Sequence, residues 1–175
     1  PARLRTTITP SLSSITTGGG SVRLEARGGT GDILLSTINA GTIGNVALIA
    51  HNDILDNTAL ELANVTAAGL LLIADADSLT GGRIGDSNVL GTRTESVNVK
   101  ALDTAVATLS AKSDEGIYVQ EANAVTVTSV TVSVDRADFD SGTTTLASTQ
   151  EDLTTTATTP GGPVKLVTLA GTITI

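Results

Sequence analysis

Apolar and polar residues alternate with a period of two along much of this chain, which is the pattern of strands with one buried face. The alternation begins in VRLEA at residues 22–26 and returns in NVALIA at 45–50. It continues in SVNVKAL at 96–102, GIYVQEA at 116–122 and VKLVTLAG at 164–171. Segments rich in Gly, Asn and Asp separate these runs, and such residues favour turns. The pattern therefore predicts many short β-strands joined by turns.

The leading apolar residues of these runs recur at a nearly constant spacing. They are Val22, Val46, Leu71, Val97 and Val119. A degenerate repeat with two or three strands in each period is typical of a solenoid. Stacked coils pair each strand with the coils above and below at about 4.8 Å. The sequence therefore predicts a parallel β-solenoid with about 22–26 residues per coil.

Composition supports a narrow interior. The chain contains one Phe, one Tyr and no Trp or Met, although 40% of its residues are hydrophobic. A β-sandwich such as a bacterial immunoglobulin-like module is the alternative, with antiparallel strands, but sandwiches usually bury aromatic side chains. Small aliphatic and β-branched residues instead fit a thin solenoid core.

The pattern also predicts how the chain is organised. Residues 1–17 are polar and are interpreted as an N-terminal cap or the end of a preceding coil. Residues 18–175 form the repeat region, in which 135–163 are expected to be an irregular coil or loop. Because the sequence begins at Pro1 and stops inside GTITI, we interpret it as an excerpt from a longer chain.

Charge and composition exclude several classes of function. The net charge of −8 and the isoelectric point near 4.4 oppose binding to nucleic acid, which needs clustered Lys and Arg. There is no Cys, so neither a disulfide framework nor a cysteine metal site is expected. No apolar run reaches the roughly 18 residues of a membrane span.

Two segments could carry chemistry, but both are better explained structurally. The glycines Gly18 to Gly20 lack the Lys-Ser/Thr pair of a phosphate-binding loop, so a turn is expected there. His51, the single histidine, lies near Asp53 and Asp56, but nothing around it prepares a nucleophile. No catalytic or cofactor-binding residue is predicted, and the chain is not expected to be an enzyme.

One carboxylate-rich segment is a candidate metal site. Oxygen-rich turns can bind Ca²⁺, and DRADFDSG places Asp135, Asp138 and Asp140 close together in sequence. The spacing matches neither an EF-hand nor a calcium-binding β-roll. Solvated turn carboxylates are therefore the alternative, and no other cofactor is expected.

A family resemblance adds to this reading. The segment 82–130 resembles the repeats of filamentous-haemagglutinin-like giant bacterial surface proteins. The first matching features are an Ile-Gly turn at Ile84-Gly85, a strand at Val97-Asn98-Val99 and an Ala/Leu-rich strand at Leu109-Ser110-Ala111. A GIYV strand follows from Gly116 to Val119, with the acidic Glu121, and then a V.V..V strand with Val125, Val127 and Val130. The resemblance implies a right-handed parallel β-helix on a cell-surface or secreted fibre.

These observations predict a structural or adhesive segment of a bacterial extracellular fibre. Exposed strand edges favour pairing with another copy, so self-association end to end is expected. A host-cell or matrix polysaccharide is a further expected partner. The alternative is a carbohydrate-binding or carbohydrate-degrading β-helix, although Tyr118 and Phe139 are the only aromatic residues available to pave a sugar cleft.

Overall fold

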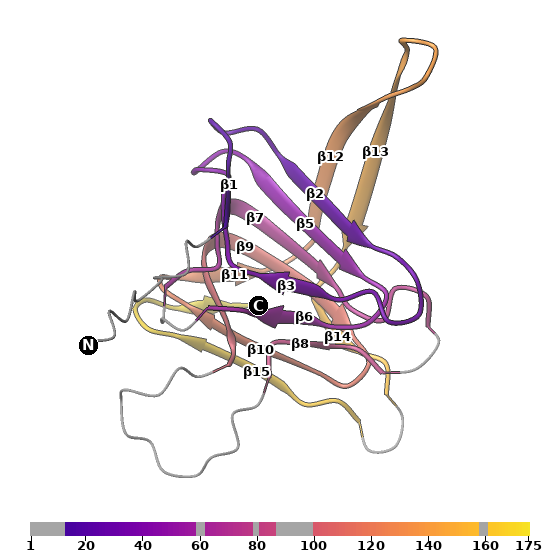
Figure 1. Ribbon diagram of the computed structural model, residues 1–175. Helices are drawn as coiled ribbons and strands as arrows, with labels where there is room; N and C mark the ends of the chain where they lie inside the picture. Colours follow the sequence, from indigo (N-terminus) through magenta and orange to yellow (C-terminus); the bar gives the residue numbers. More distant parts are fainter. Residues whose placement is uncertain (1–12, 59–61, 79–80, 87–99, 158–160) are drawn as a thin grey trace, which may run out of the picture.

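The protein is an all-β molecule in the computed structural model, which describes residues 13–58, 62–78, 81–86, 100–157 and 161–175 (Figure 1). No helix occurs among these residues. The strands are β1 Ser14–Thr16, β2 Val22–Ala26, β3 Ile33–Leu35, β4 Thr37–Asn39, β5 Asn45–Ala50, β6 Ile54–Asp56, β7 Val65–Ile73, β8 Arg83–Ile84, β9 Leu102–Ser113, β10 Gly116–Glu121, β11 Val125–Val127, β12 Val130–Ala137, β13 Thr143–Gln150, β14 Leu153–Thr155, β15 Val164–Thr168 and β16 Ile173–Thr174.

Fourteen of the described strands form one sheet, and every pairing in it is parallel. Its longest path of neighbours is β1-β4-β7-β9-β10-β8-β6-β3, which runs out along one side and returns along the other. The sheet is thereby curved into a half-barrel, and Figure 1 shows β1, β2 and β3 together at one end. The main apolar core lies inside this curve, where Leu48, Leu70 and Leu109 are fully buried.

The other two strands, β12 and β13, form an antiparallel hairpin that projects from the sheet (Figure 1). We call residues 130–150 the arm. Its root packs on the outer face of β5 and β7, where Ala47, Ile49 and Leu71 form a second buried cluster with Val130 and Val132 of the arm. Both faces of β5 and β7 are therefore buried, which explains why NVALIA and GLLLI are almost continuously apolar.

The predicted right-handed β-helical solenoid is wrong for this structure. The parallel strands form a half-barrel sheet with a separate antiparallel sheet, and the paired positions do not follow one repeat length. Val22 pairs with Val46 and Val46 with Leu70, which are two equal steps along the sequence. The next step, from Leu70 to Leu109, is more than one and a half times as long. A coil of uniform length is incompatible with these steps.

The predicted alignment of apolar residues is correct only at its first step. Val22 and Val46 are partners, but Leu71 pairs with Ala47 and lies under the arm rather than in the main core. Since side chains alternate between faces, a shift of one residue exchanges inside for outside. Val119 pairs with Leu102 and Leu166 on another part of the sheet, and Val97 lies outside the described residues.

The two segments expected to lie outside the regular repeat, 1–17 and 135–163, both contain strands. Within 1–17, residues 14–16 form β1, which pairs with β4, and residues 1–12 lie outside the described residues. About half of 135–163, expected to be irregular, belongs to the end of β12, to β13 and to β14, and the rest of its described residues lie outside strands. Lys165 pairs with Tyr118, so the VKLVTLAG run lies on β15 beside β10.

Candidate functional site

The strands β1, β2 and β3 form an open end of the sheet, which we call the front end. Among the described residues, each pairs with one neighbour only, namely β4, β5 and β6. An unpaired edge presents a row of backbone N–H and C=O groups that can accept another strand. The front end is therefore a candidate surface for strand addition.

The backbone of β3 shows which groups face outward. The Ile33 N–H donates to the Asp53 carbonyl at 2.8 Å, and the Asn57 N–H donates to the Leu35 carbonyl at 2.9 Å. In a parallel strand, alternate residues direct their backbone groups to opposite edges. The N–H and C=O of Leu34 consequently face away from β6, and its side chain is 59% exposed.

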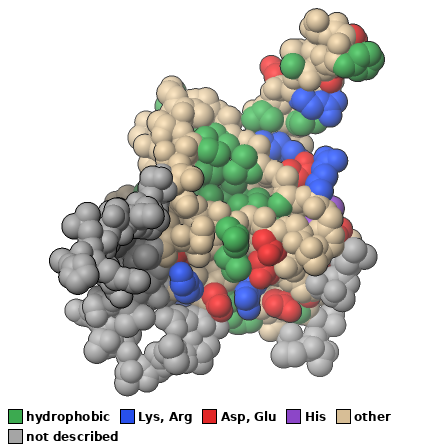
Figure 2. Space-filling model, viewed as in Figure 1, with side chains coloured by type: hydrophobic (Ala, Val, Ile, Leu, Met, Phe, Trp, Pro, Cys, Tyr) green, Lys and Arg blue, Asp and Glu red, His purple; other side chains and the backbone are tan. Residues whose placement is uncertain are grey.

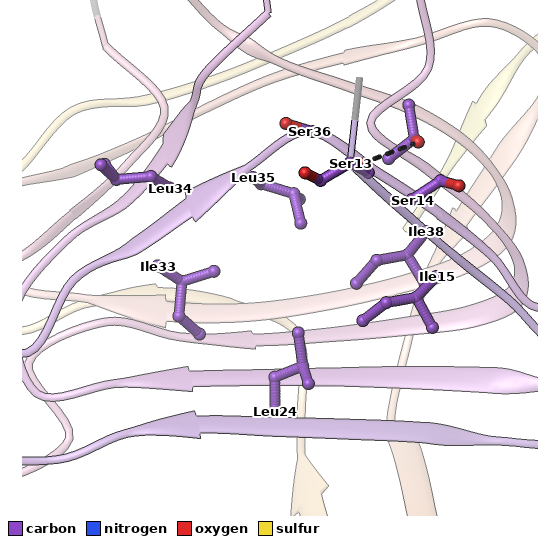
Figure 3. A pocket seen from close by; sticks show the side chains of 10 residues that line it. Ser13, Ser14, Ile15, Leu24, Ile33, Leu34, Leu35, Ser36 and Ile38 are labelled. Carbon is purple, nitrogen blue, oxygen red and sulfur yellow. Dashed lines mark hydrogen bonds between the residues drawn. The ribbon is translucent and has the colours of Figure 1, made fainter. Parts of the chain in front are cut away.

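A cavity of about 180 Å³ opens at the front end (Figure 3). The side chains of Ile15, Leu24 and Ile33 line it together with Leu35 and Ile38, and Figure 3 shows them converging on one space while Leu34 points away. Its remaining lining residues are Leu34 and the polar Ser13, Ser14, Ser36 and Thr37. The described lining contains no carboxylate, so the pair of acids that glycoside hydrolysis requires is not available here.

The opposite end of the sheet, which we call the rear end, is formed by β14, β15 and β16. Each of these strands also has one described neighbour, respectively β9, β10 and β11. Two apolar side chains beside β15 are exposed: Val164 is 46% exposed and Leu169 66%. In the described part of the chain, the two ends thus combine parallel edges that have one neighbour each with apolar side chains that water contacts.

One ion-paired cluster lies beside the front end. The Glu25 carboxylate on β2 contacts Arg23 Nη1 at 2.7 Å and Arg27 Nε at 2.9 Å. Hydrogen bonds from Arg27 and then from Arg23 lower the pKa of Glu25 to about 2. The carboxylate therefore stays ionised at neutral pH, and it compensates much of the positive charge on this edge strand.

The three candidate calcium ligands lie on the arm, and each accepts a hydrogen bond of its own. The Thr145 hydroxyl donates to Asp135 at 2.7 Å, Arg136 Nη2 donates to Asp138 at 3.0 Å, and the Gly142 N–H donates to Asp140 at 3.0 Å. No group of three acidic or His side chains in the described part of the chain is placed to hold a metal ion. Calcium binding at these residues stays a prediction.

The contacts of the turn at Gly18 to Gly20 and of His51 stabilise turns of the fold. Gly19 has a φ of +98°, and a Cβ there would lie 2.6 Å from Ile43 Cγ1, so this turn requires glycine. His51 Nδ1 lies 3.0 Å from Asp77 Oδ2 and 3.1 Å from the Gly28 nitrogen. His51 therefore connects three successive turns of the half-barrel; no hydroxyl nucleophile appears among these partners.

Sequence reasoning missed a set of buried polar groups at the turns. Asn64 is completely buried, and its Nδ2 donates to Asp56 Oδ1 at 2.8 Å, while its Oδ1 accepts from the Asp103 N–H at 2.9 Å. These contacts fix the turns between β6, β7 and β9. Asn-Val-Thr at 64–66 has the form of a glycosylation site, but burial of the Asn64 side chain closes it to modification.

Comparison with protein-family models, with curated proteins and with solved structures gives no match to this chain. The candidate site is therefore argued from the geometry of the sheet ends. No helix in the described residues has both the length and the apolar character needed to cross a membrane.

Proposed function

We propose that this chain is a structural, self-associating segment of a bacterial extracellular or cell-surface fibre. The observation that carries the proposal is that, among the described residues, the outermost strands at the front and rear ends of the one parallel sheet each have a single paired neighbour. Copies that add front end to rear end keep all strands parallel, and a heterologous contact of this kind is not closed by symmetry. Repetition of the contact would produce a filament.

The side chains at the two ends support this arrangement. The front cavity is lined mainly by aliphatic side chains, and the rear end exposes Val164 and Leu169. Burying apolar area contributes about 25 cal/mol for each Å² removed from water. Contact between the ends would therefore stabilise the assembly in addition to the new backbone hydrogen bonds.

The test is a proline substitution on the front edge. Leu34→Pro removes an outward N–H and leaves the ladder between β3 and β6 intact. Leu34→Ala is the matched control, because it removes the same side chain but keeps the N–H. Sedimentation velocity over a range of concentrations, with negative-stain microscopy, measures assembly.

We expect the unmodified chain and Leu34→Ala to form linear oligomers as concentration rises, and Leu34→Pro to remain a monomer with a similar circular dichroism spectrum. A chain that sediments as a monomer up to millimolar concentration would contradict the proposed function. So would oligomers of Leu34→Pro as stable as those of Leu34→Ala.

A further inference from the structure

The arm crosses the outer face of the sheet toward the front end and then extends beyond it. We propose that this overhanging part is a clasp, which lies on the outer face of the next copy at the front end. The inference rests on the proposed function, since it names a second contact within the same assembly. Figure 2 shows the arm standing clear of the body, with acidic and basic side chains near its end.

The contacts of the arm root establish its direction. Val130 lies beside Gly69 of β7, where a Cβ on the glycine would be 3.2 Å from Val130 Cγ1. Asn45 Nδ2 of β5 donates to the Thr131 carbonyl at 3.1 Å. Arg23 Nε of β2 then donates to the Ser148 hydroxyl at 3.3 Å. The arm thus passes over β7, β5 and β2 in turn and reaches the last described strand on this side of the front end.

The overhang is long enough to cover strands of a neighbour. Val132 pairs with Ser148 at β2, and five further pairs follow, from Ser133 with Ala147 to Ala137 with Thr143. At about 3.4 Å per residue, these pairs span roughly 17 Å. Strands in a sheet lie about 4.8 Å apart, so the overhang reaches across about three additional strands.

The underside of the overhang continues the face that packs on the sheet. Val134, Arg136 and Leu146 lie on the same face as Val130 and Val132, because alternate residues of a strand share a face. Val130 is 3% exposed and Val132 is 1% exposed, whereas Val134 and Leu146 are only half-buried. Apolar surface therefore faces the space beside β2, together with Arg136, which is ion-paired with Asp138 two residues further along the arm.

The rear end offers a matching surface. The arm leaves the sheet after β11 and returns to it at β14, so Glu151 and Asp152 lie at the rear end beside the root. Val127 pairs with Leu109, and Leu153 pairs with Ala111. In a front-to-rear stack, this root lies about two strand spacings beyond β2, which corresponds to about three arm residues. Counted from Val132, three to four residues reach Asp135 and Arg136. Arg136 lies on the face toward the sheet, so it would be the cation nearest Glu151 of the second copy, and it would bridge Glu151 and its own partner Asp138.

The first experiment shortens the arm. Residues 134–146 are replaced by Asn-Gly, which joins the paired residues Ser133 and Ala147 through a favoured two-residue turn. The root residues are kept, so the outer apolar cluster stays covered. We expect the shortened chain to fold with an unchanged thermal midpoint and to assemble with a dissociation constant at least about tenfold higher.

The second experiment uses the absence of cysteine from the chain. In Arg136→Cys/Glu151→Cys, a disulfide between copies should form on oxidation. Asp135→Cys/Glu151→Cys is the matched control, because the adjacent residue points to the other face of the arm. Non-reducing electrophoresis should show a ladder of linked copies for the first variant and much less for the second.

The outcomes separate the two proposals. Unchanged association of the shortened chain, or equal cross-linking of the two cysteine variants, would overturn the clasp and leave the pairing of sheet edges intact. If the unmodified chain does not self-associate at all, the proposed function fails, and the clasp fails with it. Weaker association of the shortened chain with selective cross-linking through position 136 supports the clasp.

Discussion

The Glu121 carboxylate accepts a 2.7 Å hydrogen bond from the Thr104 hydroxyl, and both side chains are buried. The Val106 N–H and the Asn123 N–H also donate to Glu121, each at 3.1 Å. A carboxylate with several donors can be accommodated inside a protein, because hydrogen bonds replace those it made to water. The Glu121 side chain therefore links the end of β10 to β9 through hydrogen bonds.

Substitution of Glu121 by Gln should lower the free energy of unfolding by about 1–3 kcal/mol, because the amide NH₂ places a donor against another donor. Urea denaturation at low protein concentration measures the change. Glu151→Gln, at an exposed position, is the control and should change stability by less than about 0.5 kcal/mol. Equal effects of the two substitutions would contradict the role given to Glu121.

The ion-paired Glu25 predicts a pH dependence. Its pKa is lowered from 4.5 to about 2 in the folded chain, so its contribution to stability is fully present above pH 4.5. The contribution is lost as pH falls from about 4.5 to about 2, and at still lower pH the carboxyl is protonated in both states. Glu25→Gln should therefore be less stable than the unmodified chain at pH 7, by about 1 kcal/mol after solvent screening.

Urea denaturation at pH 7 and near pH 2 tests this prediction. The stability difference between Glu25→Gln and the unmodified chain should shrink at the lower pH. A difference that stays constant across this range would show that the ion pairs with Arg23 and Arg27 do not provide it.

Leu48 and Leu34 provide a matched test of the core. Leu48 is completely buried in the half-barrel, whereas Leu34 is 59% exposed on β3. Leu48→Ala should cost about 2–5 kcal/mol of stability, through lost burial and the cavity that remains. Leu34→Ala should cost less than about 0.5 kcal/mol of monomer stability, measured by chemical denaturation at low protein concentration.

Gly82 should tolerate no side chain. Its φ is +139°, and a Cβ there would lie 2.6 Å from the Asp75 nitrogen. Gly82→Ala is expected to destabilise the fold by at least about 1–3 kcal/mol, because strain and backbone overlap act together. Gly18→Ala has no atom within 4 Å of its new Cβ and should be nearly neutral. Thermal melts of the two variants distinguish these outcomes.

Local patterning predicted the strands more successfully than their arrangement. Alternation in VRLEA and NVALIA correctly pairs Val22 with Val46, because in both strands every second residue from this Val faces the main core. It fails at GLLLI, where both faces are buried and alternation cannot distinguish Leu70 from Leu71. The missing information is tertiary: the arm, distant in sequence, covers the outer face.

The hairpin of the arm could not be predicted from the sequence pattern either. Its first strand continues the Val alternation of β11, which favours one long strand, while its second strand is rich in Thr with little apolar content. The candidate sheet ends follow from pairing across the whole chain, which no local motif encodes. Buried turn residues such as Asn64 resemble ordinary polar turn residues until their partners are known.

The place where the arm joins the sheet affects how the arm can change during evolution. Val127 and Leu153 pair with Leu109 and Ala111, which are next-but-one neighbours on the same strand. The chain leaves the sheet and resumes next to where it left, so the surrounding register is independent of what lies between. Mutation could lengthen, shorten or exchange that segment without rebuilding the half-barrel. The arm is thus a replaceable module on an unchanged support, where diversity between related chains would be expected to accumulate.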